Sequence, residues 1–339
     1  MDVPADLALI RHKLASMAML GLSTLIGVLT NTFIIVVNII DKIKGKNLSS
    51  PDLILATLSA SNVLFQFIML TNDYVSFLHT DLYFTDKVYI TFTVLLILPV
   101  YSSFWFTVCL SVYYCLQIVI FTHPLLIRLK LVVSRWVPHL LIASIFTSMT
   151  TGLPAAWNFY RDEQDFNTSS NQNTEISVPK LNVIYLLPSN LISCSLPLVL
   201  VGIADVLIIK ALVTHRHKVD RNTNGESSGH AEGRVRAART ISCLLLLYML
   251  FYISEIFMFI DVFPPSSPGF CACLMVIYSY PPAQSIVLIL GSPKLKQILL
   301  CPLQEKMVSG GREEPPSCNL KVSAILLLLL FVKGLMRME

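Results

Sequence analysis

The stretch Leu288-Ile-Leu-Gly-Ser-Pro-Lys-Leu-Lys296 closes the last of seven apolar segments in this chain. Its counterpart Asn31-Thr-Phe-Ile34 lies in the first of them. Each segment is about 20 residues or longer, which is the length that a helix needs to cross roughly 30 Å of hydrocarbon. No water is available in that layer to bond the backbone, so such segments must be helical. The expected spans are Ser16–Ile40, Pro51–Asn72, Val88–Ile120, Val137–Trp157, Val183–Val213, Ala237–Val262 and Phe270–Leu290.

The composition supports the same fold class. Of the 339 residues, 54% are hydrophobic and only 14% are charged, whereas a soluble domain carries about 25% charged residues. We therefore expect an all-α membrane protein, a seven-transmembrane helical bundle of the type found in G-protein-coupled receptors, over residues 16–291.

Basic residues gather in alternate connections between the spans. Lys42, Lys44 and Lys46 follow the first span, and further lysines and arginines lie between the third and fourth spans and between the fifth and sixth. The positive-inside rule places these connections in the cytosol and residues 1–15 outside the cell, although Arg11 and Lys13 weigh weakly against this orientation. The expected location is the plasma membrane, with several passes.

The outer connection between Asn158 and Asn182 is polar and long. It contains Asn167-Thr-Ser, an acceptor sequence for N-glycosylation on the outer face. A second triplet, Asn47-Leu-Ser, lies on the cytosolic side in this topology. We therefore expect a glycan at Asn167.

The chain after the seventh span divides into two parts. Residues 292–301 are expected to form a short helix on the inner membrane surface. In it, Lys294 and Lys296 would face the head groups, and Leu295 would enter the lipid. Residues 302–339 form a cytoplasmic tail, expected to be disordered apart from an apolar stretch at 324–332 that is too short to span a membrane.

Several polar residues and prolines lie inside the expected spans. Asn31, Asn62 and Ser285 lie near mid-depth, where they form either a hydrogen-bond network that rearranges on switching or simple contacts between helices. Pro197, Pro281 and Pro282 are expected to break the ladder of hydrogen bonds in the fifth and seventh spans. Pro124 is expected to end the third helix.

No pattern of catalytic or metal-binding residues emerges. The sequence has neither His-Glu-x-x-His nor a glycine-rich phosphate-binding motif, and the Cys271-x-Cys273 pair lacks a second ligand pair on its side. We expect no enzyme activity, no metal, no cofactor and no nucleic-acid partner.

Motifs in the spans resemble those of one receptor family. They include Asn31-Thr-Phe-Ile, Cys109-Leu-Ser-Val, His123-Pro124, Leu245-Leu-Leu-Tyr248, Ser279-Tyr-Pro281 and Leu288-Ile-Leu-Gly-x-Pro-Lys-Leu-Lys. From about Asn31 to Gln297 the chain is similar to the bitter taste receptors, taste receptor type 2. The third span ends without Asp-Arg-Tyr and the seventh lacks Asn-Pro-x-x-Tyr, which disfavours an ordinary rhodopsin-like receptor.

The resemblance implies a receptor that binds small, bitter molecules in the outer half of the bundle and activates a heterotrimeric G protein of the gustducin/Gi class. The implied ligand contacts are Leu96, Val100, Ser103, Phe251, Leu274 and Tyr278. The implied G-protein contacts are Phe121, His123, Pro124, His215, Arg234 and Arg236. The chain departs from the family at Asn62, where arginine is usual, so the implied switch network of Asn31, Asn62 and Ser285 is neutral here.

Three alternatives remain open on the sequence. A vomeronasal type 1-like chemoreceptor shares the topology but matches the pattern after Leu288 less closely. A small-solute or ion transporter would use Asp205 and Glu255, which lie within the fifth and sixth spans, as ion sites. A receptor-like chain that no longer signals would explain Asn62.

Overall fold

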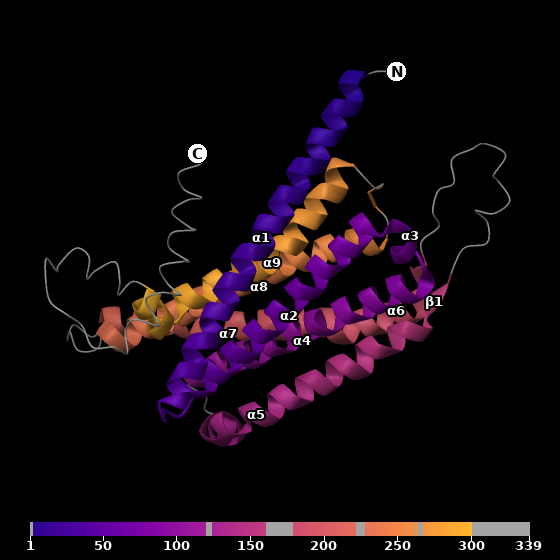
Figure 1. Cartoon of the computed structure of the whole chain (residues 1–339). Helices are drawn as coiled ribbons and strands as arrows, with labels where there is room; N and C mark the ends of the chain where they lie inside the picture. The colour runs from indigo at the N-terminus through magenta and orange to yellow at the C-terminus, as the bar shows by residue number, and fades with distance from the viewer. Residues whose placement is uncertain are drawn as a thin grey trace, which may run out of the picture. The chain divides into compact units, whose positions relative to one another are not determined.

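The computed structural model describes residues 3–119, 124–160, 179–221, 228–260, 262–263 and 267–299 (Figure 1). Three predicted site residues, Phe121, His123 and Asn167, and the predicted tail at 302–339 lie outside these ranges. The chain divides into two compact units, one of residues 1–60 with 208–339 and one of residues 61–207. Each unit is described by itself below.

Long helices account for most of the described residues. The helices are α1 (Val3–Ile43), α2 (Ser50–Leu78), α3 (Thr80–Tyr83), α4 (Asp86–Ile118), α5 (Pro124–Gly152), α6 (Val183–Asn190), α7 (Leu196–Arg221), α8 (Ser228–Phe259) and α9 (Pro268–Gly291). Within the described ranges, seven helical stretches are long and apolar enough to cross a membrane. The predicted fold class is therefore confirmed, and the protein is a multi-pass membrane protein.

The prediction that Pro124 ends the third helix was wrong. Helix α4 already ends at Ile118, and Pro124 is the first residue of α5. The first position of a helix suits proline because its ring fixes a helical φ and the missing N–H would have no partner inside the helix there. Proline at this point therefore starts the fourth span instead of ending the third.

The fifth span is interrupted where the sequence predicts a break. Between α6 and α7, residues Leu191–Ser195 form a π-helical segment, and Pro197 lies near the start of α7. Proline removes one backbone donor, and its ring crowds the carbonyl four residues earlier, here Ser193. A wider π turn relieves that crowding, which explains its position directly before the proline.

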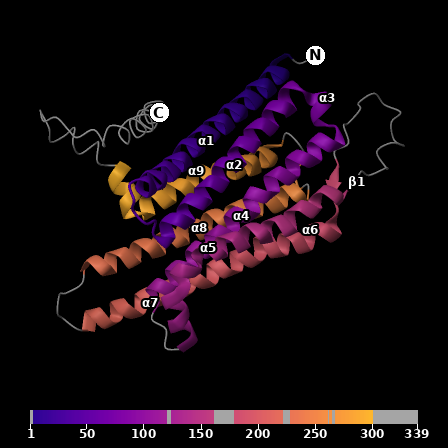
Figure 2. The ribbon, with the colours of Figure 1, turned by 60° about the horizontal axis from the view of Figure 1, so that its bottom comes forward.

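In the first unit, α9 packs against both α1 and α8, and Figure 2 shows α1 and α9 running side by side. Ile34 of α1, Tyr248 of α8 and Leu288 of α9 are among its buried core residues. Helices α8 and α9 come very close at Thr240 and Gly291, since a Cβ added at Gly291 would overlap the side chain of Thr240. Glycine at this position allows the close approach.

In the second unit, α4 packs along α5, and Gly152 lies against Leu98. The α2 residues of this unit are linked to α4 by the Ser61 hydroxyl, which donates to the Pro99 carbonyl at 2.8 Å. After α5, a 3₁₀ turn at Leu153–Trp157 leads to strand β1 (Phe159–Tyr160), which pairs antiparallel with β2 (Lys180–Leu181). Asn182 then caps α6 by accepting from the Ile184 N–H at 3.0 Å.

Candidate functional site

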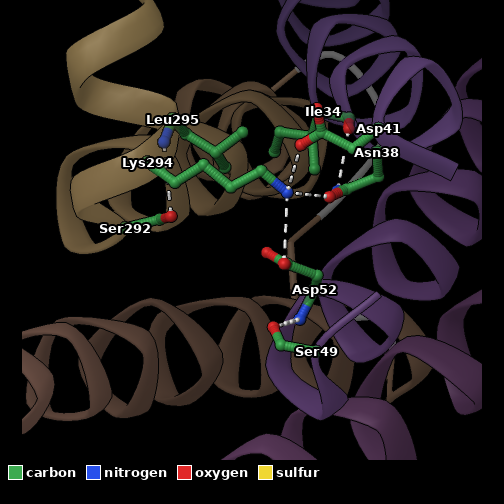
Figure 3. A network of polar contacts seen from close by, with 8 residues as sticks. All are labelled: Ile34, Asn38, Asp41, Ser49, Asp52, Ser292, Lys294 and Leu295. Atoms are coloured by element: carbon green, nitrogen blue, oxygen red, sulfur yellow. Dashed lines mark hydrogen bonds and ion pairs between the residues drawn. The ribbon is translucent and has the colours of Figure 1, made fainter. Parts of the chain in front are cut away.

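Lys294 is the centre of a polar cluster at one end of the first unit, where α1 ends and α2 begins. Its ammonium Nζ lies 3.0 Å from Asp41 Oδ2 and 3.1 Å from Asp52 Oδ2, and it donates to Asn38 Oδ1 at 2.9 Å (Figure 3). An ammonium group has three donors, so these contacts use its full capacity. The cluster joins the residues after α9 to the end of α1 and the start of α2.

Local structure fixes both sides of this cluster. The Ser49 hydroxyl accepts from the Asp52 N–H at 3.3 Å in the first turn of α2, which holds that turn in place. Residues 293–299 are helical, and Ser292 accepts from the Leu295 N–H at 3.4 Å (Figure 3). Leu295 is fully buried.

These contacts correct two predictions about the short helix after the seventh span. Lys294 points to Asp41 and Asp52 and not to head groups, and Leu295 enters the protein core and not the lipid. The sequence pattern fits either arrangement, because it does not show that two carboxylates from other helices face this turn. Lys296 is exposed.

A cavity of about 420 Å³ opens beside the cluster. Its lining is polar for the most part and consists of Asp41, Lys46, Asn47, Leu48, Asp52, Lys294, Gln297 and Ile298. Lysines and aspartates are equal in number in this lining, so the cavity has no strong preference for one sign of charge.

A second polar group joins α1 to α9 at mid-depth. The Asn31 amide donates to the carbonyls of Gly27 at 2.9 Å and of Pro281 at 3.4 Å. The hydroxyls of Thr30 and Ser285 lie 2.6 Å apart, and all these side chains are buried. Sequence reasoning selected Asn31 and Ser285 but missed Thr30, which resembles any other threonine on a helix.

The Thr30–Ser285 pair has two equivalent arrangements of its hydrogens. Thr30 lies 2.8 Å from the Ile26 carbonyl, and Ser285 lies 2.8 Å from the Pro282 carbonyl. Each hydroxyl has one hydrogen, so only one of them can donate to a carbonyl while the other donates across the pair. When Ser285 donates to Thr30, the Thr30 hydroxyl bonds the Ile26 carbonyl of α1. When Thr30 donates to Ser285, the Ser285 hydroxyl bonds the Pro282 carbonyl of α9.

Asn62, the third predicted member of the switch network, lies in the second unit. It is buried in α2, and its Oδ1 accepts from the Ser103 hydroxyl of α4 at 3.4 Å. Ser103 is also one of the predicted ligand contacts. The structure therefore brings one predicted switch residue and one predicted ligand residue into contact.

The predicted ligand contacts are buried or half-buried in both units. In the second unit Val100 and Ser103 are buried on α4, and Leu96 lies half-buried one turn further out. In the first unit Phe251 and Tyr278 are buried and Leu274 is half-buried. The ring of Phe251 lies 4.8 Å from that of Tyr280, which accepts a hydrogen bond from the Gln284 amide at 3.0 Å.

In the second unit, Tyr83 of α3 lies in the connection between α2 and α4. Its hydroxyl donates to Asn72 Oδ1 at 3.1 Å, and its ring packs edge-on against Tyr89. Burial, with a smaller contribution from Tyr89, raises the pKa of Tyr83 to about 12, although the Asn72 bond lowers it. The phenol therefore stays protonated and keeps its hydrogen bond at physiological pH.

The predicted G-protein contacts are only partly described. Pro124 is exposed at the start of α5, and the backbone of His215 lies within α7. Arg236 of α8 pairs with Glu232 at 2.8 Å, and Arg234 is half-buried. An exposed pair one helical turn apart contributes only about 0.3–0.5 kcal/mol, so the fold does not depend on Arg236 for stability.

The described residues contain no group of three or more His, Cys, Asp or Glu side chains able to hold a metal ion. Asp205 is buried in α7, and Glu255 is half-buried in α8.

Comparisons with known proteins agree with the motifs in the spans. Residues 9–307 match the family model described as "Taste receptor protein (TAS2R)". The chain is 31% identical to taste receptor type 2 member 40 of Gallus gallus, over 81% of this chain and 90% of that protein. It is also 31% identical to member 119 of Mus musculus, over 84% of each chain. Member 7 of Pongo pygmaeus is 29% identical, over 81% of this chain and 88% of its own length.

Proposed function

The chain belongs to the taste receptor type 2 family of bitter taste receptors, and on that basis we propose that it binds small bitter molecules and activates a heterotrimeric G protein of the gustducin/Gi class. The proposal places it in the plasma membrane with its amino terminus outside. Membership of this family excludes the vomeronasal type 1-like alternative.

The outer halves of the spans are the proposed binding region. Val100 and Ser103 face inward on α4, and Ser103 bonds to Asn62. The contact that carries the proposal is this bond, because it joins a ligand-facing turn to a buried polar side chain deeper in the bundle. Phe251, Leu274 and Tyr278 are the proposed ligand contacts of the first unit, where they are buried or half-buried.

A ligand moves a receptor between two states only by binding them with different affinity. Hydrogen-bonded pairs that have two arrangements are suited to such a change, since exchanging them alters the free energy little. The Thr30–Ser285 pair between α1 and α9 has this property, and Asn31 supports it through the Pro281 carbonyl. We propose these residues, with Asn62, as the switch elements.

The proposed G-protein surface consists of Phe121, His123, Pro124, His215, Arg234 and Arg236. Support comes from the cytosolic placement of these residues under the positive-inside rule and from the exposure of Pro124. Arginines there also attract acidic lipid head groups, so their charge alone does not identify a protein partner.

The test is intracellular calcium in cells that express this chain with a gustducin-type chimeric G protein and receive a panel of bitter compounds. We expect a dose-dependent response that Val100→Trp abolishes and Val206→Trp retains. Val206 is an exposed valine of α7, so the control adds the same bulk away from the proposed site. Absence of any response, with surface expression verified for all three receptors, would contradict the proposal.

A further inference from the structure

Gln66 of α2 is buried without hydrogen-bond partners. It is 2% exposed, and neither its amide nitrogen nor its amide oxygen has a hydrogen-bond partner among the described residues. Buried amides in proteins are almost always bonded, so an exception calls for an explanation.

The surroundings of Gln66 on its own helix are mostly apolar, and the polar side chain one turn before it, Asn62, accepts its hydrogen bond from Ser103 instead. Phe65 and Met69 are both buried beside it on α2. Among the described residues, no side chain therefore bonds the Gln66 amide, which holds two donors and an acceptor. An amide kept unbonded in such surroundings destabilises the free protein.

The helix register places Gln66 beside the predicted ligand contacts of the same unit. Asn62 on α2 bonds to Ser103 on α4, and Ser61 bonds to the Pro99 carbonyl. Gln66 follows Asn62 by four residues, so it lies on the same face and about 6 Å further towards the outer side. Helix α4 runs in the opposite direction, and one turn outward from Pro99 and Val100 is Leu96.

We propose that Gln66 is a hydrogen-bonding anchor for the agonist and that it selects ligands with a cis amide, such as lactams. This proposal rests on the proposed function and names the chemical class of ligand. A cis amide presents its N–H and its carbonyl on the same edge, so it pairs with a primary amide through two parallel hydrogen bonds. On binding, the buried Gln66 amide would therefore form the hydrogen bonds that it lacks in the free receptor.

The test uses purified receptor in detergent micelles and four probes with a seven-membered ring. ε-Caprolactam has the donor and the acceptor, N-methylcaprolactam and ε-caprolactone lack the donor, and cycloheptanone has a carbonyl alone. Ligand-induced shifts of the unfolding temperature, measured over a concentration series, give an apparent Kd for each probe. We expect the lactam to bind about tenfold more tightly than each of the other three.

Variants assign this preference to Gln66. Gln66→Met has a similar shape but no amide. This variant is expected to bind all four probes with about the same apparent Kd. Thr71→Val is the matched control, because Thr71 is an exposed residue of the same helix whose hydroxyl bonds only to its own turn, at the Phe67 carbonyl. It is expected to keep the tenfold ratio.

Equal binding of the lactam and N-methylcaprolactam to the unmodified receptor would overturn the proposal, and that arm needs no variant to fold. An unchanged ratio in Gln66→Met would overturn it as well. The purified receptor is assayed without a G protein, so a lactam preference in micelles with no calcium response in cells would reject only the proposed signalling function. Calcium responses to other bitter compounds without a lactam preference would reject only the role of Gln66.

Discussion

The ammonium group of Lys294 lies 3.1 Å from a carboxylate oxygen of Asp52, so the chain just after the seventh span is tied to the first turn of α2. The same lysine reaches Asp41 at the end of α1. A single side chain therefore joins three elements of the first unit: the end of α1, the start of α2 and the chain after α9. The side chains of Asp41 and Asp52 are only 10% and 17% exposed. Removing the lysine would leave these two carboxylates largely buried without a cation, which destabilises the folded protein.

Lys294→Met is expected to lower the free energy of unfolding by about 2 kcal/mol, less than for a fully buried pair because Lys294 is 30% exposed. Thermal unfolding of the purified receptor measures the change. Lys296→Met removes an exposed charge two residues away and should have little effect. When Asp41→Asn and Asp52→Asn are added to Lys294→Met, most of the lost free energy of unfolding should return, because no unpaired carboxylate remains. Equal unfolding temperatures for the two single lysine variants would show that the cluster does not hold these elements together.

The Thr30–Ser285 pair is expected to couple α1 and α9. Thr30→Val and Ser285→Ala should each reduce stability by about 1 kcal/mol, and the double variant by less than the sum, since both remove the same bond. A double-mutant cycle from thermal or denaturant unfolding gives the coupling. Strictly additive effects would mean that the two hydroxyls do not interact.

Gly291→Ala is expected to separate α8 and α9, because the added methyl group overlaps the Thr240 side chain. The expected loss is about 1–3 kcal/mol. Thr240→Ala in the same chain should restore part of it. Gly202→Ala is the matched control, since a Cβ there meets no other atom within 4 Å. If Gly291→Ala and Gly202→Ala are equally stable, α8 and α9 do not pack as closely at Thr240 as the structure indicates.

Glycosylation tests the proposed orientation. Asn167→Gln should abolish the change in gel mobility that follows treatment with an N-glycosidase, whereas Asn47→Gln should leave it intact, because only Asn167 lies outside in the proposed topology. Loss of the glycan in the Asn47 variant alone would instead place the α1–α2 connection outside and invert the topology.

The spans and their helical state follow from the sequence because hydrocarbon permits few alternatives to an apolar helix. The partners of polar residues do not follow. Asn31 and Ser285 stand out as polar residues at mid-depth, but their contacts with the Pro281 carbonyl and Thr30 depend on how α1 and α9 pack. That register is a property of three-dimensional packing and has no signature in a single segment.

Two further residues show the same limit. Lys294 fits a membrane-surface helix as well as an ion-pair centre, and only the positions of Asp41 and Asp52 decide between them. Gln66 carries no signal in the sequence, since a glutamine in an apolar helix looks the same whether it is bonded or not. Its lack of partners is a property of the packed unit.

The most direct measurement of the central claim is nucleotide exchange on a purified gustducin heterotrimer mixed with this receptor in lipid nanodiscs. An agonist found in the calcium screen should accelerate exchange in a dose-dependent manner, and Val100→Trp should remove the acceleration without lowering the basal rate. Exchange that no agonist changes, from a receptor shown to be folded by its thermal unfolding transition, would contradict the claim that ligand binding drives this chain to activate its G protein.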